Sequence, residues 1–74
     1  MNLKRLGAVV RQHRETAGLS QEKLADLSNL HKETIVRIER GTGKSGPHIA
    51  ALCRIAEALG VSCSALLAEA ELIG

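Results

Sequence analysis

The chain has 74 residues, of which 45% are hydrophobic, 24% are charged and none is aromatic. This length allows one domain over residues 1–74 and excludes a multi-domain enzyme. A core without aromatic residues favours packed helices over sheets. The net charge is +2, but residues 1–44 hold nine Lys or Arg against five Asp or Glu. Either these charges solvate helix surfaces, or one end of the molecule faces an anion.

The cysteine content indicates a cellular compartment. Cys53 and Cys63 allow at most one bridge, unlike the dense disulfide frameworks of small secreted proteins. A reducing compartment is therefore favoured, and we expect two buried thiols rather than metal ligands or a redox switch. The apolar run at residues 6–10 is too short for a signal sequence, and no stretch approaches the ~20 apolar residues of a membrane span. The sequence thus predicts a cytoplasmic protein that does not contact a membrane.

The first half of the chain predicts two helices joined by a short turn. Apolar residues recur at three-, four- and seven-residue spacings over residues 3–17, as in an amphipathic helix. Gly18 can take the left-handed conformation that ends this helix. Ser20 is a typical N-cap for a short second helix over residues 21 to about 27. Asn29 is the non-glycine residue best suited to a positive φ in the turn that follows.

The second half predicts three more helices around a loop. A third helix is expected over residues 32–40, and Gly41 ends it. Residues 41–47 hold three glycines and the only proline, so they form a loop. A fourth helix is predicted over residues 48–59, and a fifth from Ser62 to about residue 73. Because helices of about two turns cannot span an up-and-down bundle, the expected fold class is all-α, an orthogonal five-helix bundle.

Residues 21–40 hold the most informative pattern. A small residue, Ala25, stands where the second and third helices would cross, and Asn29 lies in the turn between them. Two helices that meet steeply over a short turn need both features, with apolar anchors beneath. Those anchors are Leu24, Leu30, Ile35 and Ile38. This is the helix-turn-helix arrangement, in which the second helix is held outward to enter a DNA major groove.

The chain resembles the Cro/cI-type helix-turn-helix regulators, also called the xenobiotic response element family. The similar segments follow one another in order along most of the chain: residues 6–7, 14, 18–25, 35–41, 55–62 and 66–67. The resemblance implies a lambda repressor-like fold and a transcriptional regulator of double-stranded DNA, with no enzymatic activity, cofactor or metal. It points to a short stand-alone form, like phage repressors and the controller proteins of restriction-modification systems.

The resemblance assigns base contacts to the outward side of the third helix. Lys32 and Arg37 can donate to guanine O6 and N7. Glu33 can accept from cytosine N4, and Thr34 can touch a thymine methyl or a phosphate. Solvated helix charges are the alternative for each of these residues.

Phosphate contacts and a structural ion pair are also implied. Gln21 begins the second helix, where free amides and the helix dipole favour an anion. The other phosphate candidates are Ser20, Lys44 and Arg14. Arg14 and Glu39 match positions that form an ion pair in similar proteins, and a carboxylate near the buried side of the third helix is costly unless paired.

Two other patterns carry less weight. Residues 43–45 look like the end of a nucleotide-binding P-loop, but Ile38 stands where that pattern needs its first glycine. His13, His31 and His48 are 17 or 18 residues apart and lack the spacing of a metal-binding helix.

The apolar residues of the last helix and the tail indicate a protein partner. The last helix and the tail carry more apolar surface than one short helix can bury, in Leu66, Leu67, Ala70, Leu72 and Ile73. We therefore expect a homodimer on a palindromic operator, which places two recognition helices on half-sites about 34 Å apart. The alternative is an antitoxin-like interaction protein, whose tail binds a partner protein and whose DNA binding is secondary.

Overall fold

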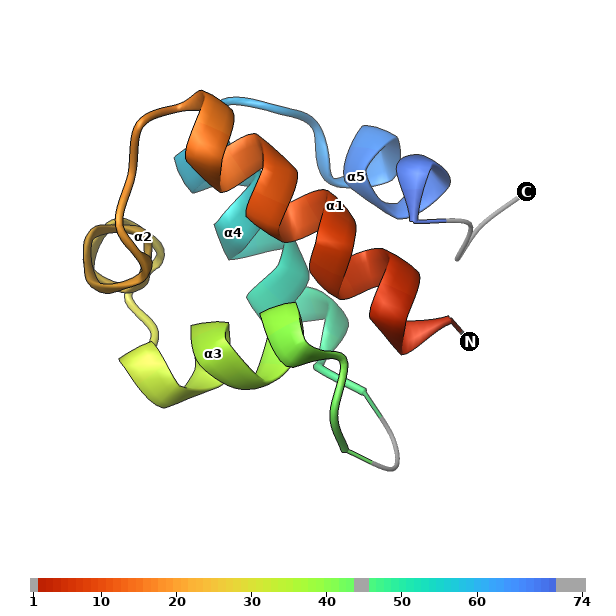
Figure 1. Cartoon of the computed structure of the whole chain (residues 1–74). Helices are drawn as coiled ribbons and strands as arrows, with labels where there is room; N and C mark the ends of the chain where they lie inside the picture. Colours follow the sequence, from red (N-terminus) through yellow and green to blue (C-terminus); the bar gives the residue numbers. More distant parts are fainter. Residues whose placement is uncertain (1, 44–45, 71–74) are drawn as a thin grey trace.

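The computed structural model describes residues 2–43 and 46–70, which form five helices and no strand (Figure 1). The helices are α1 (Leu3–Thr16), α2 (Gln21–Ser28), α3 (Lys32–Arg40), α4 (Ile49–Leu59) and α5 (Cys63–Glu69). The all-α class and the order of the helices are confirmed. His48, which stands where similar proteins carry a Ser or Thr N-cap, is the N-cap of α4 and makes no side-chain capping bond. Residues 71–73 of the expected fifth helix lie outside the described residues.

Local signals set the helix ends. The Ser20 hydroxyl accepts a hydrogen bond from the Lys23 backbone N–H at 2.9 Å, and the Ser62 hydroxyl accepts one from that of Ala65 at 3.1 Å. Asn29 has a φ of +56°, the left-handed conformation predicted for the turn between α2 and α3. Ser20 and Asn29 thus begin and end α2, and Ser62 begins α5, where the sequence predicts.

The helices cross at steep angles. α1 packs against α3 and α5, α2 packs against α3 and α4, and α4 packs against α5. In Figure 1, α2 is seen end-on while α3 lies across the view, so the two helices of the motif are strongly inclined to one another. The orthogonal arrangement predicted from the short helices is therefore confirmed.

The core is aliphatic and takes side chains from every helix. Its largest fully buried members are Leu6, Val10, Leu24, Ile35, Ile55 and Leu66. Of the predicted anchors of the motif, Leu24, Ile35 and Ile38 are buried, and Leu30 is half-buried against the core. The inner side of α3 is thus fixed by apolar packing, which determines the side that it presents outward.

Gly7 sets how closely α1 approaches α3. A Cβ atom at Gly7 would lie 2.5 Å from the backbone oxygens of both Ile38 and Glu39, a distance that no side chain tolerates. The two helices therefore touch backbone to backbone near the end of α3. This close contact explains why a glycine is needed in the segment at residues 6–7, which resembles the family.

The apolar face of α5 lies inward. Leu66, Leu67 and Ala70 are buried in the core of the same chain, so the expectation that they supply surplus apolar surface for a partner is wrong. The sequence pattern does not reveal that α5 packs against both α1 and α4, and this packing buries the apolar surface that we expected to be exposed. Leu72 and Ile73 lie outside the described residues. The exposed residues of α5 are three small ones, Ser64, Ala65 and Ala68, and the acidic Glu69.

A disulfide joins α4 to α5. Cys53 and Cys63 are bonded, with their Cα atoms 4.8 Å apart, and both residues are half-buried. The expectation of two buried free thiols is therefore wrong. The turn at residues 60–62 folds α5 back onto α4 and brings the two cysteines together, which their spacing alone does not reveal.

No individual helix in the described part of the chain has the length and hydropathy to cross a membrane. α4 and α5 pass that test only as a pair, and the pair is bent by 103°.

Candidate nucleic-acid interface

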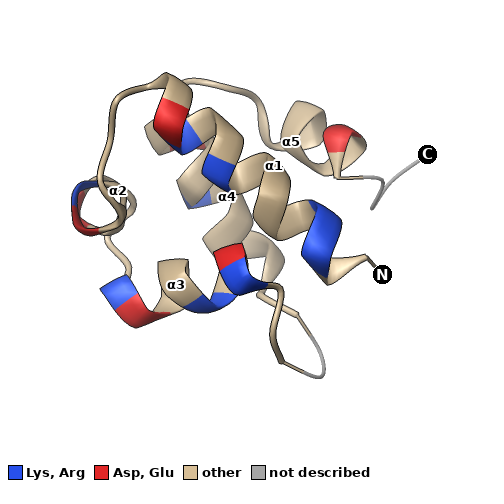
Figure 2. Ribbon diagram, viewed as in Figure 1, with Lys and Arg blue, Asp and Glu red and all other residues tan. Residues whose placement is uncertain are grey.

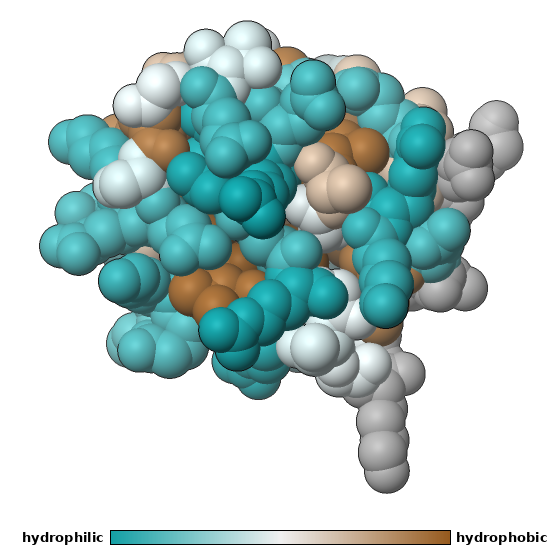
Figure 3. All heavy atoms as spheres, in the orientation of Figure 1, coloured by the Kyte–Doolittle hydropathy of each residue, from teal (hydrophilic) through white to brown (hydrophobic). Residues whose placement is uncertain are grey.

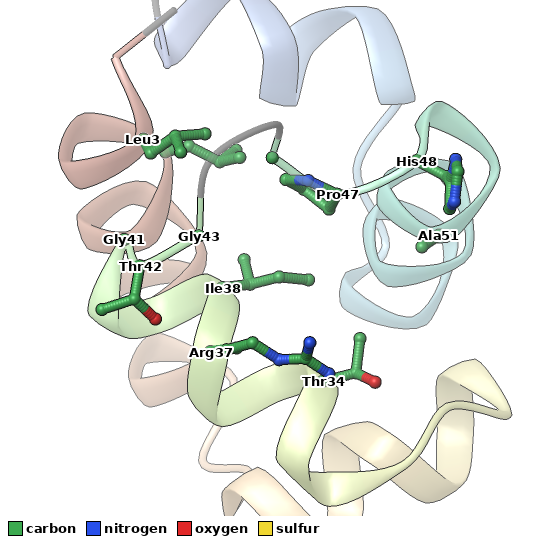
Figure 4. A pocket seen from close by; sticks show the side chains of 12 residues that line it. Leu3, Thr34, Arg37, Ile38, Gly41, Thr42, Gly43, Pro47, His48 and Ala51 are labelled. Carbon is green, nitrogen blue, oxygen red and sulfur yellow. The ribbon is translucent and has the colours of Figure 1, made fainter.

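The outward side of α3 is charged and open. Lys32, Glu33 and Arg37 are exposed, and Thr34 is half-buried. Lys32, Glu33 and Thr34 form the first turn of the helix, and Arg37 follows Thr34 by one turn on the same side (Figure 4). The structure therefore places Thr34 and Arg37 side by side, whereas Lys32 lies beside Ser20 and Gln21 at the start of α2.

A hollow of about 430 Å³ runs beside α3. Thr34 and Arg37 border it on one side, and Pro47 and His48 border it where α4 begins (Figure 4). Leu3, Leu6 and Ile38 add apolar wall. The accessible face of α3 thus continues across the hollow to the first turn of α4, so a larger molecule could contact both helices at once.

The charges are distributed unevenly over the helices. Figure 2 shows Lys and Arg segments on α1, α2 and α3, whereas α5 shows a single acidic segment. That segment is Glu69, and α5 contains no basic residue. The face seen in Figure 3 is largely hydrophilic, with small hydrophobic areas between the polar side chains. An anionic partner is therefore favoured on α3 rather than on α5.

A nearly buried ion pair lies beneath this face. Arg14 Nε donates to Glu39 Oε2 at 2.7 Å, and Arg14 Nη2 donates to Glu39 Oε1 at 3.1 Å. The two side chains are only 12% and 4% exposed. Hydrogen bonding to Glu39 raises the pKa of Arg14, against an opposing contribution from burial. The predicted structural pair is confirmed, with the bidentate geometry that guanidinium and carboxylate favour.

The rest of the Arg14 guanidinium is also engaged. Its Nη1 donates to the backbone oxygen of Leu19 at 2.8 Å, in the segment between α1 and α2. With all three nitrogens bonded and little surface exposed, Arg14 has a structural role, and its geometry does not favour the phosphate contact also predicted for it.

Gln21 joins the same network. Its Nε2 donates to Glu39 Oε1 at 3.1 Å, so the first residue of α2 is tied to the end of α3. The sequence reasoning missed this link, because the two residues are 18 positions apart and share no local spacing. The second Nε2 hydrogen of Gln21, the Ser20 hydroxyl and the first backbone amides of α2 are the groups that an anion could use here. Lys44, the other phosphate candidate, lies outside the described residues.

Further polar contacts fasten α1 to α5. His13 Nε2 lies 2.8 Å from Glu69 Oε2, and Arg5 Nε donates to the Glu69 backbone oxygen at 3.0 Å. These contacts also escaped the sequence reasoning. Within residues 2–43 and 46–70, no three His, Cys, Asp or Glu side chains are grouped closely enough to hold a metal ion.

Known proteins are similar to this chain in sequence and fold. A helix-turn-helix family model, HTH_3, matches residues 10–66. A protein of Methanothermobacter thermautotrophicus, described as an uncharacterized HTH-type transcriptional regulator, is 38% identical over 52 residues, which cover 70% of this chain and 72% of that protein.

Solved structures of other regulators have a similar fold. The restriction-modification controller protein C.AhdI from Aeromonas hydrophila is 33% identical, with a TM-score of 0.80 over 86% of this chain and 94% of that one. The clp gene regulator ClgR from Corynebacterium glutamicum is 28% identical, with a TM-score of 0.84 over 96% of this chain and 73% of that one. The outward α3, the buried ion pair and these similarities lead to one conclusion: the chain belongs to the helix-turn-helix family of DNA-binding transcriptional regulators.

Proposed function

We propose that the protein is a sequence-specific transcriptional regulator that binds double-stranded DNA as a homodimer, with α3 in the major groove. The observation that carries this proposal is the open outward side of α3, whose opposite side is fixed by buried apolar anchors and by the contact with Gly7. A rigid helix with exposed donors and acceptors can present them to base edges at a fixed distance and angle.

Two cations are the base readers in this proposal. Lys32 and Arg37 donate to guanine O6 and N7, and the planar guanidinium of Arg37 can do so with two hydrogen bonds. Glu33 accepts from cytosine N4 and repels phosphates that approach in a wrong register. Thr34 borders the hollow and contacts a thymine methyl or a phosphate.

Phosphate binding is assigned to the start of α2. Gln21 is held in place by Glu39 while one amide hydrogen stays available, and Ser20 and the free backbone amides lie beside it. Fixing the side chain before DNA arrives lowers the entropy lost on binding. Lys44 remains a candidate for a further phosphate contact.

The homodimer follows from the size of the reading surface. A single recognition helix contacts only a few base pairs, and two copies on half-sites about 34 Å apart double the sequence information. α5 has no basic residue, and apart from Glu69 at its end its exposed residues are small and uncharged, which suits a two-fold contact away from DNA. The regulatory role is supported by the names of the similar controller and regulator proteins, and we place the protein in the cytoplasm.

Selection from a pool of random duplexes tests this function. The purified protein should enrich one inverted repeat, with half-site centres about one helical turn apart and an affinity at least about 10³-fold above that for random duplex. The double variant Lys32→Ala/Arg37→Ala, selected in parallel, should enrich no such repeat. Enrichment of no sequence by the natural protein, or of the same sequence by both proteins, would contradict the proposal.

A further inference from the structure

The disulfide between α4 and α5 has no role in the DNA-binding face described above. Cys53 lies within α4 and Cys63 is the first residue of α5, so the bond bridges the turn at residues 60–62. The chain has no third cysteine, so neither sulfur can exchange with another thiol of the same chain. Two oxidation states are therefore open to one molecule: a bridged form and a form with two thiols.

The two cysteines differ from the core residues around them in exposure. Both are half-buried, whereas Leu52, Ile55 and Leu66 of the same two helices are fully or almost fully buried. Small oxidants and reductants can thus reach the sulfur atoms without global unfolding. A disulfide that serves stability alone is better protected when it is buried with the core.

The packing of α5 does not rest on the bond alone. Leu66, Leu67 and Ala70 are buried in the core, and Arg5 and His13 contact Glu69. We therefore expect that breaking the bond loosens the start of α5 while these contacts hold the rest of the helix on the domain. Such a change would alter the orientation of the exposed side of α5 more than the fold.

We propose that Cys53 and Cys63 form a reversible dithiol–disulfide pair that responds to peroxides and regulates pairing of the chain through α5. The bridged form holds α5 in the orientation that binds a second copy, and the dithiol form binds it more weakly. This inference rests on the proposed homodimer, because the oxidation state of the two cysteines acts on the contact between the α5 helices of two copies.

The chemistry needs only a peroxide and, for the return step, a dithiol. One cysteine thiolate attacks a peroxide oxygen, the O–O bond breaks, and a sulfenic acid forms as water leaves. The second thiolate attacks the sulfenic sulfur, the S–S bond forms, and a second water leaves with the sulfenic oxygen. The two sulfur atoms together lose two electrons, and hydrogen peroxide gains them. A reducing dithiol reverses the reaction by two exchange steps and becomes a disulfide itself.

Oxidation should raise the thermal stability of the protein as well as strengthen its dimer. Closing a ten-residue separation with a covalent bond restricts the unfolded chain. For a domain of this size we expect the midpoint of thermal unfolding to fall by about 10 °C on reduction. The dissociation constant of the dimer should rise at least about fivefold, the lower end of ordinary coupling between two sites.

The experiment compares the full chain after treatment with hydrogen peroxide and after treatment with dithiothreitol. Thiol titration counts the free cysteines, thermal unfolding reports stability, and sedimentation equilibrium gives the dimer dissociation constant. The double variant Cys53→Ser/Cys63→Ser is the matched control, because serine keeps the shape of the side chain and cannot form the bridge. We expect no free thiol after peroxide, two after dithiothreitol, the shifts given above, and no response in the variant.

Three results would overturn the proposal. Two free thiols after peroxide would show that the pair does not oxidise. A bond that resists dithiothreitol until the protein unfolds would make it a permanent structural link. Equal dimer dissociation constants in the two states, or a monomer in both, would remove the coupling to pairing. Thiol titration needs neither DNA nor a dimer, so failure of the redox chemistry is distinguished from failure of the proposed DNA-binding function.

Discussion

At the scale of single residues, one carboxylate organises the molecule. Glu39 binds Arg14 of α1 through two hydrogen bonds and Gln21 of α2 through a third, so one buried group connects three helices. Removing water from two charges is costly, and it is offset here by close bidentate geometry and by bonds to the remaining donors. The side chain that holds Gln21, the proposed phosphate contact, therefore also stabilises the fold.

Replacing this carboxylate should be far more damaging than replacing an exposed one. Glu39→Gln leaves the Arg14 guanidinium buried without a counter-charge, and we expect a loss of about 3 kcal/mol or more in the free energy of unfolding. The matched control is Glu15→Gln, which removes an exposed pair with Arg11 at 3.5 Å and should cost less than about 1 kcal/mol. Urea unfolding of both variants measures the difference. Equal losses would contradict the role assigned to Glu39.

The pH dependence of this network follows from the direction of one pKa shift. Hydrogen bonding to Glu39 raises the pKa of Arg14 in the folded protein. The stability that this shift contributes is complete below the ordinary arginine pKa and is lost only as the pH rises through the raised folded value. Titration of Arg14 therefore leaves stability unchanged through the neutral range.

At the scale of helices, the position of α3 depends on how closely α1 approaches it. Gly7 leaves room for the backbone oxygens of Ile38 and Glu39, and no other residue type fits there without moving one helix. Moving α3 by a fraction of an ångström would change both the ion pair and the outward face. Helix packing and the proposed reading of DNA by α3 thus depend on the same contact.

Gly7→Ala tests the close approach of α1 to α3. In an open helix this change stabilises by up to about 1 kcal/mol through helix propensity, whereas here we expect a loss of about 1–3 kcal/mol from overpacking. Gly18→Ala is the control, because a Cβ there meets nothing within 4 Å and only the positive φ of +72° opposes it. That variant should lose about 1–2 kcal/mol and keep its DNA affinity. Urea unfolding and DNA binding of both proteins measure the outcome. Stabilisation by Gly7→Ala would refute the close contact.

Features that depend on a few neighbouring residues could be predicted from the sequence. The caps at Ser20 and Ser62, the left-handed turn at Asn29 and the range of α3 all follow from short-range rules of helix ends and turns. The ion pair between Arg14 and Glu39 was found through the family resemblance and the cost of burying a lone charge.

Features that depend on the angles between helices could not be predicted in the same way. The Cys53–Cys63 bond requires the fold of α5 onto α4, and the burial of Leu66 requires the packing of α5 against α1 and α4. The hydrogen bond from Gln21 to Glu39 requires the crossing of α2 and α3. None of these distances is encoded in a local spacing.

At the scale of the whole molecule, charge and exposure divide the surface by function. α3 offers exposed cations, and α5 offers small exposed residues and the acidic Glu69, so we propose that α3 meets DNA and α5 a second copy of the chain. A two-fold axis through the α5 contact would leave both α3 helices free for successive turns of DNA.

Sedimentation equilibrium of two charge variants tests the dimer. Ala68→Glu places like charges on both sides of a two-fold contact, and we expect its dimer dissociation constant to rise at least tenfold. Ala8→Glu introduces the same change at an exposed position of α1 and should dimerise as the natural protein does. Removing residues 72–74 tests the tail separately. Identical dimer dissociation constants for Ala68→Glu and Ala8→Glu would show that α5 does not form the dimer contact.

The most direct measurement concerns the reading of bases by α3. The natural protein, Arg37→Ala and Lys32→Ala are each assayed against every single base-pair substitution of the selected duplex, with Arg54→Ala of α4 as the exposed control. Each α3 variant should lose about 1–3 kcal/mol of binding free energy and become indifferent to the base at one position in each half-site, while Arg54→Ala keeps the natural profile. If Arg37→Ala and Lys32→Ala weaken binding to all duplexes equally, including random ones, then α3 holds phosphates and does not read sequence.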